Sequence, residues 1–295
     1  MKMSDQIKQL LKYIPLLIVV MAITVFFMGL VSYAGIAPLA DEAYHLRTDI
    51  NQLSEEKTSL QEDVSELQKI ASDPVKEKER YFENAVALEN EIAEGISPYK
   101  AAYLTFDDGP FNLTYEYLRV LKEHNTLGTF FVLGKTDYLP VYEAIINDGH
   151  TLGNHTYSHL IRKGLYYSPE SFIKDVLKQD AFIKENFDYQ MTVFRFPGGS
   201  SSSGKMKDKC INLLHENGYN YVDWNSLTRD AEIRGLTLEE AYNYVMPRAL
   251  TKDFSVLLMH DFNSASLGAL PTIIETLQEN NYVMLPLFKD SRAVH

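Results

Sequence analysis

The fold is decided by the stretch Leu104-Thr105-Phe106-Asp107-Asp108-Gly109-Pro110. The residues from 101 to 106 are apolar apart from one threonine, which is typical of a buried β-strand. Two adjacent carboxylates follow, and the Gly-Pro pair then forces a turn. Paired acids at the end of a rigid strand favour a functional site, although alternation along the strand alone would point them to opposite faces. The alternative is that one acid caps the next helix and the other is merely solvated.

Length and composition indicate a globular protein with one substantial domain and a smaller part. The chain has 295 residues, of which 45% are hydrophobic and 23% are charged. A net charge of −12 argues against a protein that binds nucleic acid through its phosphates. Cys210 is the one cysteine, so an intrachain disulfide is excluded, and we expect a buried thiol in a helix.

The N-terminal part carries an apolar run long enough to cross a bilayer. Residues 14–31 contain no charge, three lysines precede them, and acidic residues follow at 41 and 42. The sequence therefore predicts a transmembrane anchor over 14–37, a cytoplasmic tail over 1–13 and an extracellular remainder, in a single-pass protein of the cell membrane. The alternative is a cleaved signal peptide, because small residues suited to cleavage lie between 32 and 37.

A heptad pattern follows the apolar run and predicts a coiled coil over 38–72. Apolar residues alternate at spacings of four and three, with one lysine in the seam; they are Leu39, Ala43, Leu46, Ile50, Leu53, Lys57, Leu60, Val64, Leu67 and Ala71. We expect a parallel homodimer, and the alternative is a helix that packs on its own domain. Residues 73–98 then read as a helical linker with few apolar positions, which Gly95 and Pro98 end.

From residue 99 to residue 295 short apolar strands alternate with amphipathic helices. Seven strands are predicted, near 103–106, 129–133, 151–154, 192–196, 219–224, 256–259 and 283–287. Helices are predicted between most of them, at 113–124, 141–148, 169–186, 205–217, 238–249 and 271–280. This α/β order predicts a parallel sheet covered by helices, either closed into a barrel or open and doubly wound.

Polar residues collect where these strands end, which is the catalytic face of a β/α barrel. The strand ends carry Asp107-Asp108, residues 153–159, residues 195–199, Asp223-Trp224-Asn225 with Asp230, and Met259-His260-Asp261. His155 and His159 are four residues apart, a spacing that brings both rings to one side if they share a helical turn. With one carboxylate they suit a catalytic Zn²⁺, or Co²⁺, Ni²⁺ or Fe²⁺; the alternative for such a pair is capping or ordinary hydrogen bonding.

Four ordered motifs carry a family resemblance, and together they span residues 99–287. They are Thr105-Phe106-Asp107-Asp108-Gly109, His155-Thr156-Tyr157-Ser158-His159, Arg195-Phe196-Pro197-Gly198-Gly199 and Leu258-Met259-His260. This set resembles the NodB-type polysaccharide deacetylases, family 4 of the carbohydrate esterases, which act on chitin, xylan or peptidoglycan. The resemblance implies a distorted (β/α)7 barrel over 99–295, a divalent metal, most simply Zn²⁺, and removal of acetyl groups from a glycan.

The resemblance also implies the roles of the strand-end residues. Asp108, His155 and His159 would be the metal ligands, and Thr156 would tie down the loop between the two histidines. Without the family, the sequence does not say which of the two adjacent acids is the ligand.

The proton-transfer groups follow from the same resemblance. Asp107 would be the general base, held and kept ionised by Arg195. His260 would be the general acid, oriented by Asp230, with Asp223 as the alternative partner.

Substrate-binding residues are implied as well, and here the chain departs from the family. Trp224 and Leu258 would line the pocket for the acetyl methyl, and Pro197 and Gly198 would border the substrate. The family usually has Tyr or Phe where Gly198 stands, and Trp where Ala231 follows the aligned acid. Both departures concern the shape of the groove, because the metal-binding positions all match.

The function predicted is metal-dependent hydrolysis of N-acetyl groups on N-acetylglucosamine units of a cell-wall glycan, most simply peptidoglycan. A chitin- or xylan-type deacetylase, including action on O-acetyl esters, is the alternative within this chemistry. Outside it stand a non-catalytic wall-binding scaffold and a glycosidase that uses paired carboxylates. The scaffold is disfavoured because every position that the family's metal site and base require holds the expected residue type.

Overall fold

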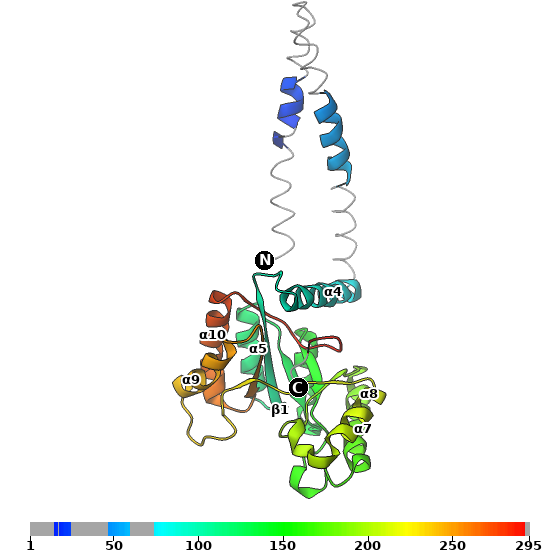
Figure 1. Cartoon of the computed structure of the whole chain (residues 1–295), viewed down its shortest axis with the longest axis vertical. Helices are drawn as coiled ribbons and strands as arrows, with labels where there is room; N and C mark the ends of the chain where they lie inside the picture. The colour runs from blue at the N-terminus through cyan, green and yellow to red at the C-terminus, as the bar shows by residue number, and fades with distance from the viewer. Residues whose placement is uncertain (1–14, 17, 25–46, 60–73, 293–295) are drawn as a thin grey trace, which may run out of the picture. The chain divides into compact units, whose positions relative to one another are not determined.

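A computed structural model describes residues 15–16, 18–24, 47–59 and 74–292 (Figure 1). The chain divides into two compact units, Met1–Tyr81 and Phe82–His295. In the first unit, residues 18–24 and 47–59 are helical. None of the helices in the described ranges is both long and apolar enough to cross a bilayer. Most of the predicted anchor (14–37) and much of the predicted coiled coil (38–72) lie outside the described residues, so both stay predictions.

The second unit is built on a curled sheet of eight strands, all of whose pairings are parallel. The strands are β1 (Lys100–Gly109), β2 (Thr129–Val132), β3 (Thr151–Asn154), β4 (Val193–Phe194), β5 (Asn220–Tyr221), β6 (Ser226–Leu227), β7 (Phe254–His260) and β8 (Tyr282–Met284). Their order is β5-β4-β3-β2-β1-β7-β6, with β8 paired to β1. The predicted parallel α/β sheet is therefore confirmed, as a half-barrel.

The prediction of seven strands was wrong by one. The predicted strand at 219–224 is shorter in the structure, and a separate strand, β6, follows it with only two residues, Ser226–Leu227. A two-residue strand has no periodicity that a sequence pattern can reveal.

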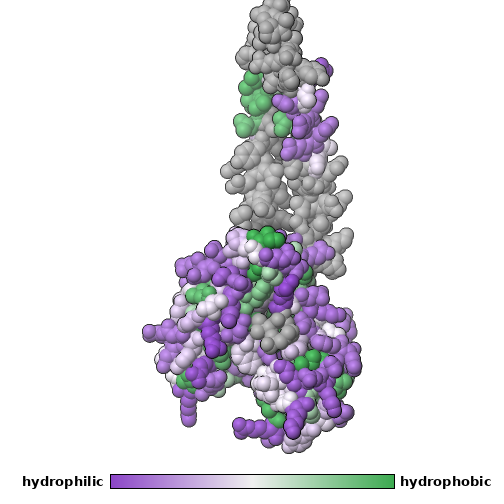
Figure 2. Space-filling view, in the orientation of Figure 1, coloured by the Kyte–Doolittle hydropathy of each residue, from purple (hydrophilic) through white to green (hydrophobic). Residues whose placement is uncertain are grey.

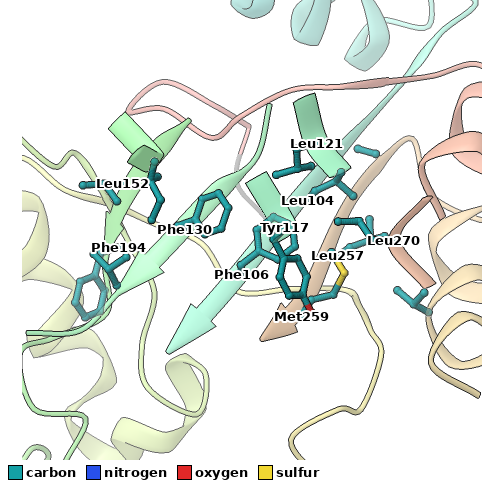
Figure 3. Packing of buried hydrophobic residues seen from close by; sticks show 14 of the residues in the cluster. Leu104, Phe106, Tyr117, Leu121, Phe130, Leu152, Phe194, Leu257, Met259 and Leu270 are labelled. Atoms are coloured by element: carbon teal, nitrogen blue, oxygen red, sulfur yellow. The ribbon is translucent and has the colours of Figure 1, made fainter. Parts of the chain in front are cut away.

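Helices cover the outer face of this sheet (Figure 1). They are α5 (Thr114–Glu123), α6 (Leu139–Asn147), α7 (Pro169–Phe187), α8 (Lys207–Glu216), α9 (Leu238–Ala249) and α10 (Ser264–Glu279), with 3-10 turns at η1 (Thr136–Tyr138), η2 (Ile161–Lys163) and η3 (Ser200–Met206). The larger core lies between sheet and helices and contains Leu104, Phe106, Phe130 and Leu257 (Figure 3). Cys210 is buried there in α8 as a free thiol, as predicted.

A second, smaller core lies on the inner face of the sheet. It includes Tyr103, Val193 and Val256 in strands and Val222 just after β5. Because side chains alternate along a strand, the residue two positions further along each of these segments points to the same inner side. Those positions are Thr105, Arg195, Trp224 and Leu258, so the inner core leads directly to the predicted site.

Helix α4 (Pro74–Ala93) contributes to this inner core from Phe82 onward. Ala85 and Ile92 are buried in the cluster, and the ring centroids of Phe82 and Phe288 lie 5.3 Å apart. The sparse apolar pattern of the segment 73–98 predicted only a linker, but these few residues are the ones that pack. On the face seen in Figure 2, hydrophobic residues reach the surface of the unit only in small patches.

Candidate active site

The end of β1 brings both adjacent carboxylates to one side of the sheet. Asp107 continues the inward series of Tyr103 and Thr105 and is 3% exposed. Asp108 should therefore face outward, but its φ is +69°, and the register of β1 against β2 shifts between Asp107 and Gly109. This left-handed residue in a bulge turns the second carboxylate back toward the first. The turn thus brings both carboxylates to the same side of the sheet, which strict alternation along a strand would not allow.

The loop after β3 carries the two histidines, and it is not helical. Thr156 and His159 both have positive φ, of +67° and +54°, so the expectation of one shared helical turn was wrong. Hydrogen bonds hold the loop instead. The Asn154 side chain accepts one from the Thr156 N–H, and Thr156 Oγ1 accepts one from the His159 N–H at 3.1 Å. The backbone N–H and the hydroxyl of Ser158 both donate to Asp175. This network offsets the cost of two left-handed residues.

Asp108, His155 and His159 form a cluster that fits a divalent cation. Nε2 of His155 lies 3.5 Å and Nε2 of His159 lies 3.3 Å from Oδ1 of Asp108. Tetrahedral ligands about 2.1 Å from zinc are roughly 3.4 Å from one another, so these separations suit such an ion. Oδ1 of Asp108 is buried and accepts no hydrogen bond from the described residues, which leaves a lone pair for a cation.

The buried ring of His155 is oriented as a ligand should be. Its Nδ1 lies 2.7 Å from the carbonyl oxygen of Arg195, to which it donates, so that Nε2 is free to bind through its lone pair. Burial lowers the pKa of His155 to about 3 even though Asp108 opposes this, so the imidazole is neutral.

Asp107 is paired with Arg195, the largest fully buried side chain of the described residues. Nη1 of Arg195 donates to Oδ1 of Asp107 at 2.9 Å and also to Oγ1 of Thr105. Burial raises the pKa of Asp107, and the charge of Arg195 only partly offsets this. Desolvation thus outweighs the ion pair in setting the pKa of Asp107, while Arg195 holds the carboxylate in place as predicted.

His260 ends β7 on the other side of the cluster. Its Nδ1 donates to Oδ1 of Asp230 at 2.7 Å, and its Nε2 lies 3.8 Å from Oδ2 of Asp108. Burial alone would lower the pKa of His260, but the hydrogen bond and charge of Asp230 raise it to about 9. Asp223, the alternative partner, instead accepts hydrogen bonds from Ser200. The structure thus places Asp230 and not Asp223 against this histidine.

The predicted substrate-binding residues surround Arg195 and His260. Leu258 precedes His260 on the same face of β7, and the Trp224 ring lies 5.8 Å from the Arg195 guanidinium carbon. Pro197 is buried, whereas Gly198 is exposed and has a φ of +73°, which a side chain would adopt only with strain. Ala231 is exposed as well. The site therefore lacks both aromatic walls at these positions.

Two residues close to the cluster carried no assigned role in the sequence. Asp261 is fully buried, its Oδ2 accepts a hydrogen bond from Thr114, and burial raises its pKa to about 7. Lys135 follows β2 and lies with its Nζ 3.1 Å above the centroid of the Phe111 ring. Neither belongs to a motif with its own spacing, although the position of each just after a strand end is a signal that could have marked it.

Comparison with known proteins agrees with this geometry. The family model described as Polysaccharide deacetylase matches residues 94–222. The crystal structure of the catalytic domain of peptidoglycan N-acetylglucosamine deacetylase from Eubacterium rectale is 32% identical, with a TM-score of 0.63 over 68% of this chain and 94% of that one. The polysaccharide deacetylase Bc1974 from Bacillus cereus is 27% identical, with a TM-score of 0.59 over 65% and 94%.

A curated relative that is also from Bacillus cereus gives a similar result. It is a peptidoglycan-N-acetylglucosamine deacetylase of Bacillus cereus, 29% identical over 188 residues, which are 62% of this chain and 67% of the relative. The fold, the order of the motifs and these likenesses lead to one family, and the chain belongs to the polysaccharide deacetylases.

Proposed function

We propose that this deacetylase removes N-acetyl groups from N-acetylglucosamine units of peptidoglycan with the help of a bound divalent metal. The observation that carries the proposal is the placement of two proton-transfer groups around one metal-binding cluster. Oδ2 of Asp107 lies 3.8 Å from Nε2 of His155, and Nε2 of His260 lies 3.8 Å from Oδ2 of Asp108. A reacting acetyl group between the two sides would be within reach of both.

The metal would be held by Asp108, His155 and His159, and zinc suits this set of two imidazoles and a carboxylate. The chemistry that a bound cation supplies is polarisation of the acetyl carbonyl and a lower pKa for water. Co²⁺ or another transition metal suits the same ligands.

Asp107 acts as the general base in this proposal. Its raised pKa gives the carboxylate a greater affinity for the proton of the attacking water than a solvated aspartate has. Arg195 fixes the carboxylate through Oδ1 and leaves Oδ2 directed toward the cluster.

His260 acts as the general acid. With its pKa raised to about 9, the ring is protonated at neutral pH, and Asp230 occupies Nδ1 so that Nε2 carries the transferable proton. An amine leaves only when it is protonated, so delivery of this proton breaks the carbon–nitrogen bond of the tetrahedral intermediate.

Peptidoglycan is the proposed substrate because the relatives named above act, by name, on its N-acetylglucosamine units. Chitin- or xylan-type glycans, and O-acetyl esters, offer the same acetyl group to the same residues. The proposed place of action is the outer side of the cell membrane. It is supported by the apolar run 14–31 with lysines before it, and the heptads over 38–72 support a homodimer.

The test is acetate release and metal content on the purified full-length chain. Zinc-loaded protein is assayed on wall glycan, chitin oligomers and acetylated xylan, beside Asp107→Ala and His155→Ala. We expect acetate from the wall glycan, no activity in either variant, and loss of metal in His155→Ala only. A protein that binds metal and glycan but releases no acetate would refute the enzyme in favour of the scaffold.

A further inference from the structure

Three aromatic rings and a lysine gather beside His260, at the ends of β1, β2 and β7. The ring of Phe262 lies 5.3 Å from that of His260 and 5.4 Å from that of Phe111. The Tyr138 ring lies 6.1 Å from that of Phe111. The ammonium of Lys135 lies over the Phe111 ring. We refer to Phe111, Lys135, Tyr138 and Phe262 as the aromatic subsite. None of the four has a part in the hydrolysis proposed above.

The aromatic subsite is open to solvent. Phe262 is 40% exposed, and Phe111 and Tyr138 are partly exposed. Apolar rings that gather at the surface next to a reacting group suit a binding surface. Pyranose rings present flat faces of C–H groups, and aromatic side chains bind such faces while the hydroxyls stay hydrated. The rings therefore suit a sugar that adjoins the reacting unit.

Lys135 adds a charge to this surface. Its side chain is half-buried, and within the described ranges its Nζ forms no hydrogen bond or ion pair and contacts only aromatic faces. Burial lowers the pKa of Lys135 to about 8, although the charges of Asp261 and Asp108 oppose the fall. The group is thus mostly an ammonium at neutral pH, with three donors and, among the described residues, no carboxylate in ion-pair contact. Such a cation is stabilised by an anion that arrives with the ligand.

We propose that the aromatic subsite binds a sugar that carries a carboxylate, next to the N-acetylglucosamine unit that reacts. This inference rests on the proposed function and adds a substrate class to it. The sugar stacks on Phe262, and its carboxylate pairs with Lys135, which lies over the Phe111 ring. A neutral glycan would gain the stacking alone. The enzyme should therefore prefer polymers with free carboxylates, such as wall glycan whose lactyl groups have been freed of their peptides.

A different role for Lys135 has to be separated from this one. Its ammonium could serve only to offset the negative charges of Asp108 and Asp261. In that case its removal would disturb the metal cluster and lower activity on every substrate by the same factor. The two roles therefore differ in substrate dependence and in metal content.

The experiment compares one polymer with and without its charge. Wall glycan stripped of its peptides is assayed before and after methyl esterification of its carboxylates, beside a neutral N-acetylglucosamine oligomer. We expect zinc-loaded wild-type chain to favour the free acid by about tenfold in kcat/KM. Lys135→Met should remove most of this preference by lowering kcat/KM on the acid form alone, and Lys135→Arg should restore part of it.

Matched controls make the outcome specific. Lys100→Met removes the same charge at the opposite end of β1, where Lys100 faces Asp253 at 3.8 Å, and should leave the preference intact. Phe262→Ala should raise KM on the acid and the ester alike by about fivefold, because it removes stacking and not charge.

The inference is overturned if the wild-type chain has the same kcat/KM on acid and ester. It is also overturned if Lys135→Met loses its metal, or if its activity falls by the same factor on all three substrates. A wild-type chain that deacetylates the neutral oligomer but shows no preference refutes the subsite and leaves the proposed function standing. If no substrate releases acetate, the proposed function fails, and calorimetric binding of acid against ester then decides the subsite separately.

Discussion

Two buried carboxylates lie close to the metal-binding cluster, and each faces a cationic side chain. Asp107 is 3% exposed and faces Arg195; Asp230 is 6% exposed and faces His260. Their burial is nearly equal, yet the pKa of Asp107 is raised and that of Asp230 is lowered. Burial raises the pKa of both carboxylates, but it outweighs the opposing groups only at Asp107.

The hydrogen bonds that each carboxylate accepts contribute to this difference, together with the charge of His260 beside Asp230. Asp230 accepts from Nδ1 and from the backbone N–H of His260 and from Oγ of Ser266. Asp107 accepts one bond within the described chain, from Arg195, whose other donors are taken up elsewhere. These other acceptors are Thr105 Oγ1, the Val222 carbonyl and the Asp223 carbonyl. A carboxylate with one donor can take up a proton, and one with three remains an anion.

The largest expected effect comes from removing the proton acceptor. Asp107→Asn keeps the shape of the side chain and abolishes its basicity, so kcat for acetate release should fall by about a thousandfold. Metal content, measured on the same preparation, should be unchanged because Asp107 is not in the cluster of Asp108, His155 and His159. His155→Ala is the control that loses metal. A variant that keeps more than about a tenth of the activity would remove Asp107 from the role of base.

The second prediction concerns Asp230 and the pH dependence of the reaction. The pKa of His260 is about 9, and only the protonated ring donates, so wild-type kcat/KM should fall as pH rises through about 9. Asp230→Asn removes the charge that raises this pKa, so the basic limb should move to lower pH, with a tenfold or larger loss, to order of magnitude, at pH 8. Ser266→Ala leaves the Asp230 charge in place and is the control in which the basic limb should stay near its wild-type position. A basic limb that does not move in Asp230→Asn would contradict the assignment.

Asp107, Arg195 and His260 could be predicted from sequence because they lie in short motifs at strand ends, whereas the choice between Asp230 and Asp223 stayed open. Alternation alone places Thr105, Asp107 and Arg195 on the inner face. The sequence did not predict the backbone conformations that depart from strand alternation. Asp108 reaches the site only through its positive φ in a bulge, and the histidine loop relies on Thr156 and His159 in the same region.

Hydrogen-bond partners that lie far away in the sequence could not be predicted either. Arg195 is fixed by carbonyl oxygens of residues 222 and 223, and Asp261 is held by Thr114, across separations that leave no local pattern. Burial raises the pKa of Asp107, and Arg195, whose other donors go to those acceptors, offsets this only in part. A motif therefore predicts which residue types meet, and the hydrogen bonds around them decide which one accepts a proton.

A moderate effect on activity is expected at Thr105, which shares a donor of Arg195 with Asp107. Thr105 Oγ1 accepts from Nη1 of Arg195 and donates to the Leu257 carbonyl, each at 2.6 Å. Thr105→Val keeps the shape and removes both bonds, so the free energy of unfolding should fall by about 1–3 kcal/mol. Because the guanidinium is then less firmly held, kcat should fall by roughly fivefold. Thr105→Ser retains the hydroxyl and should behave like wild type in denaturant titration and in acetate release; equal losses in both variants would mean that packing, and not the shared donor, matters.

The smallest effect on activity is expected at the other end of β1, where a third buried carboxylate has no catalytic neighbour. Glu89 accepts from the hydroxyl of Tyr103 at 2.6 Å and from the backbone N–H of Arg292 at 2.8 Å, and burial raises its pKa. Tyr103→Phe should lower the free energy of unfolding by about 1 kcal/mol and leave kcat unchanged. Since Tyr103 lies two residues before Thr105 on the same face, a parallel fall in kcat would show that the strand transmits the disturbance. The contrast between Asp107 and Asp230 could then no longer be attributed to the donors at each carboxylate alone.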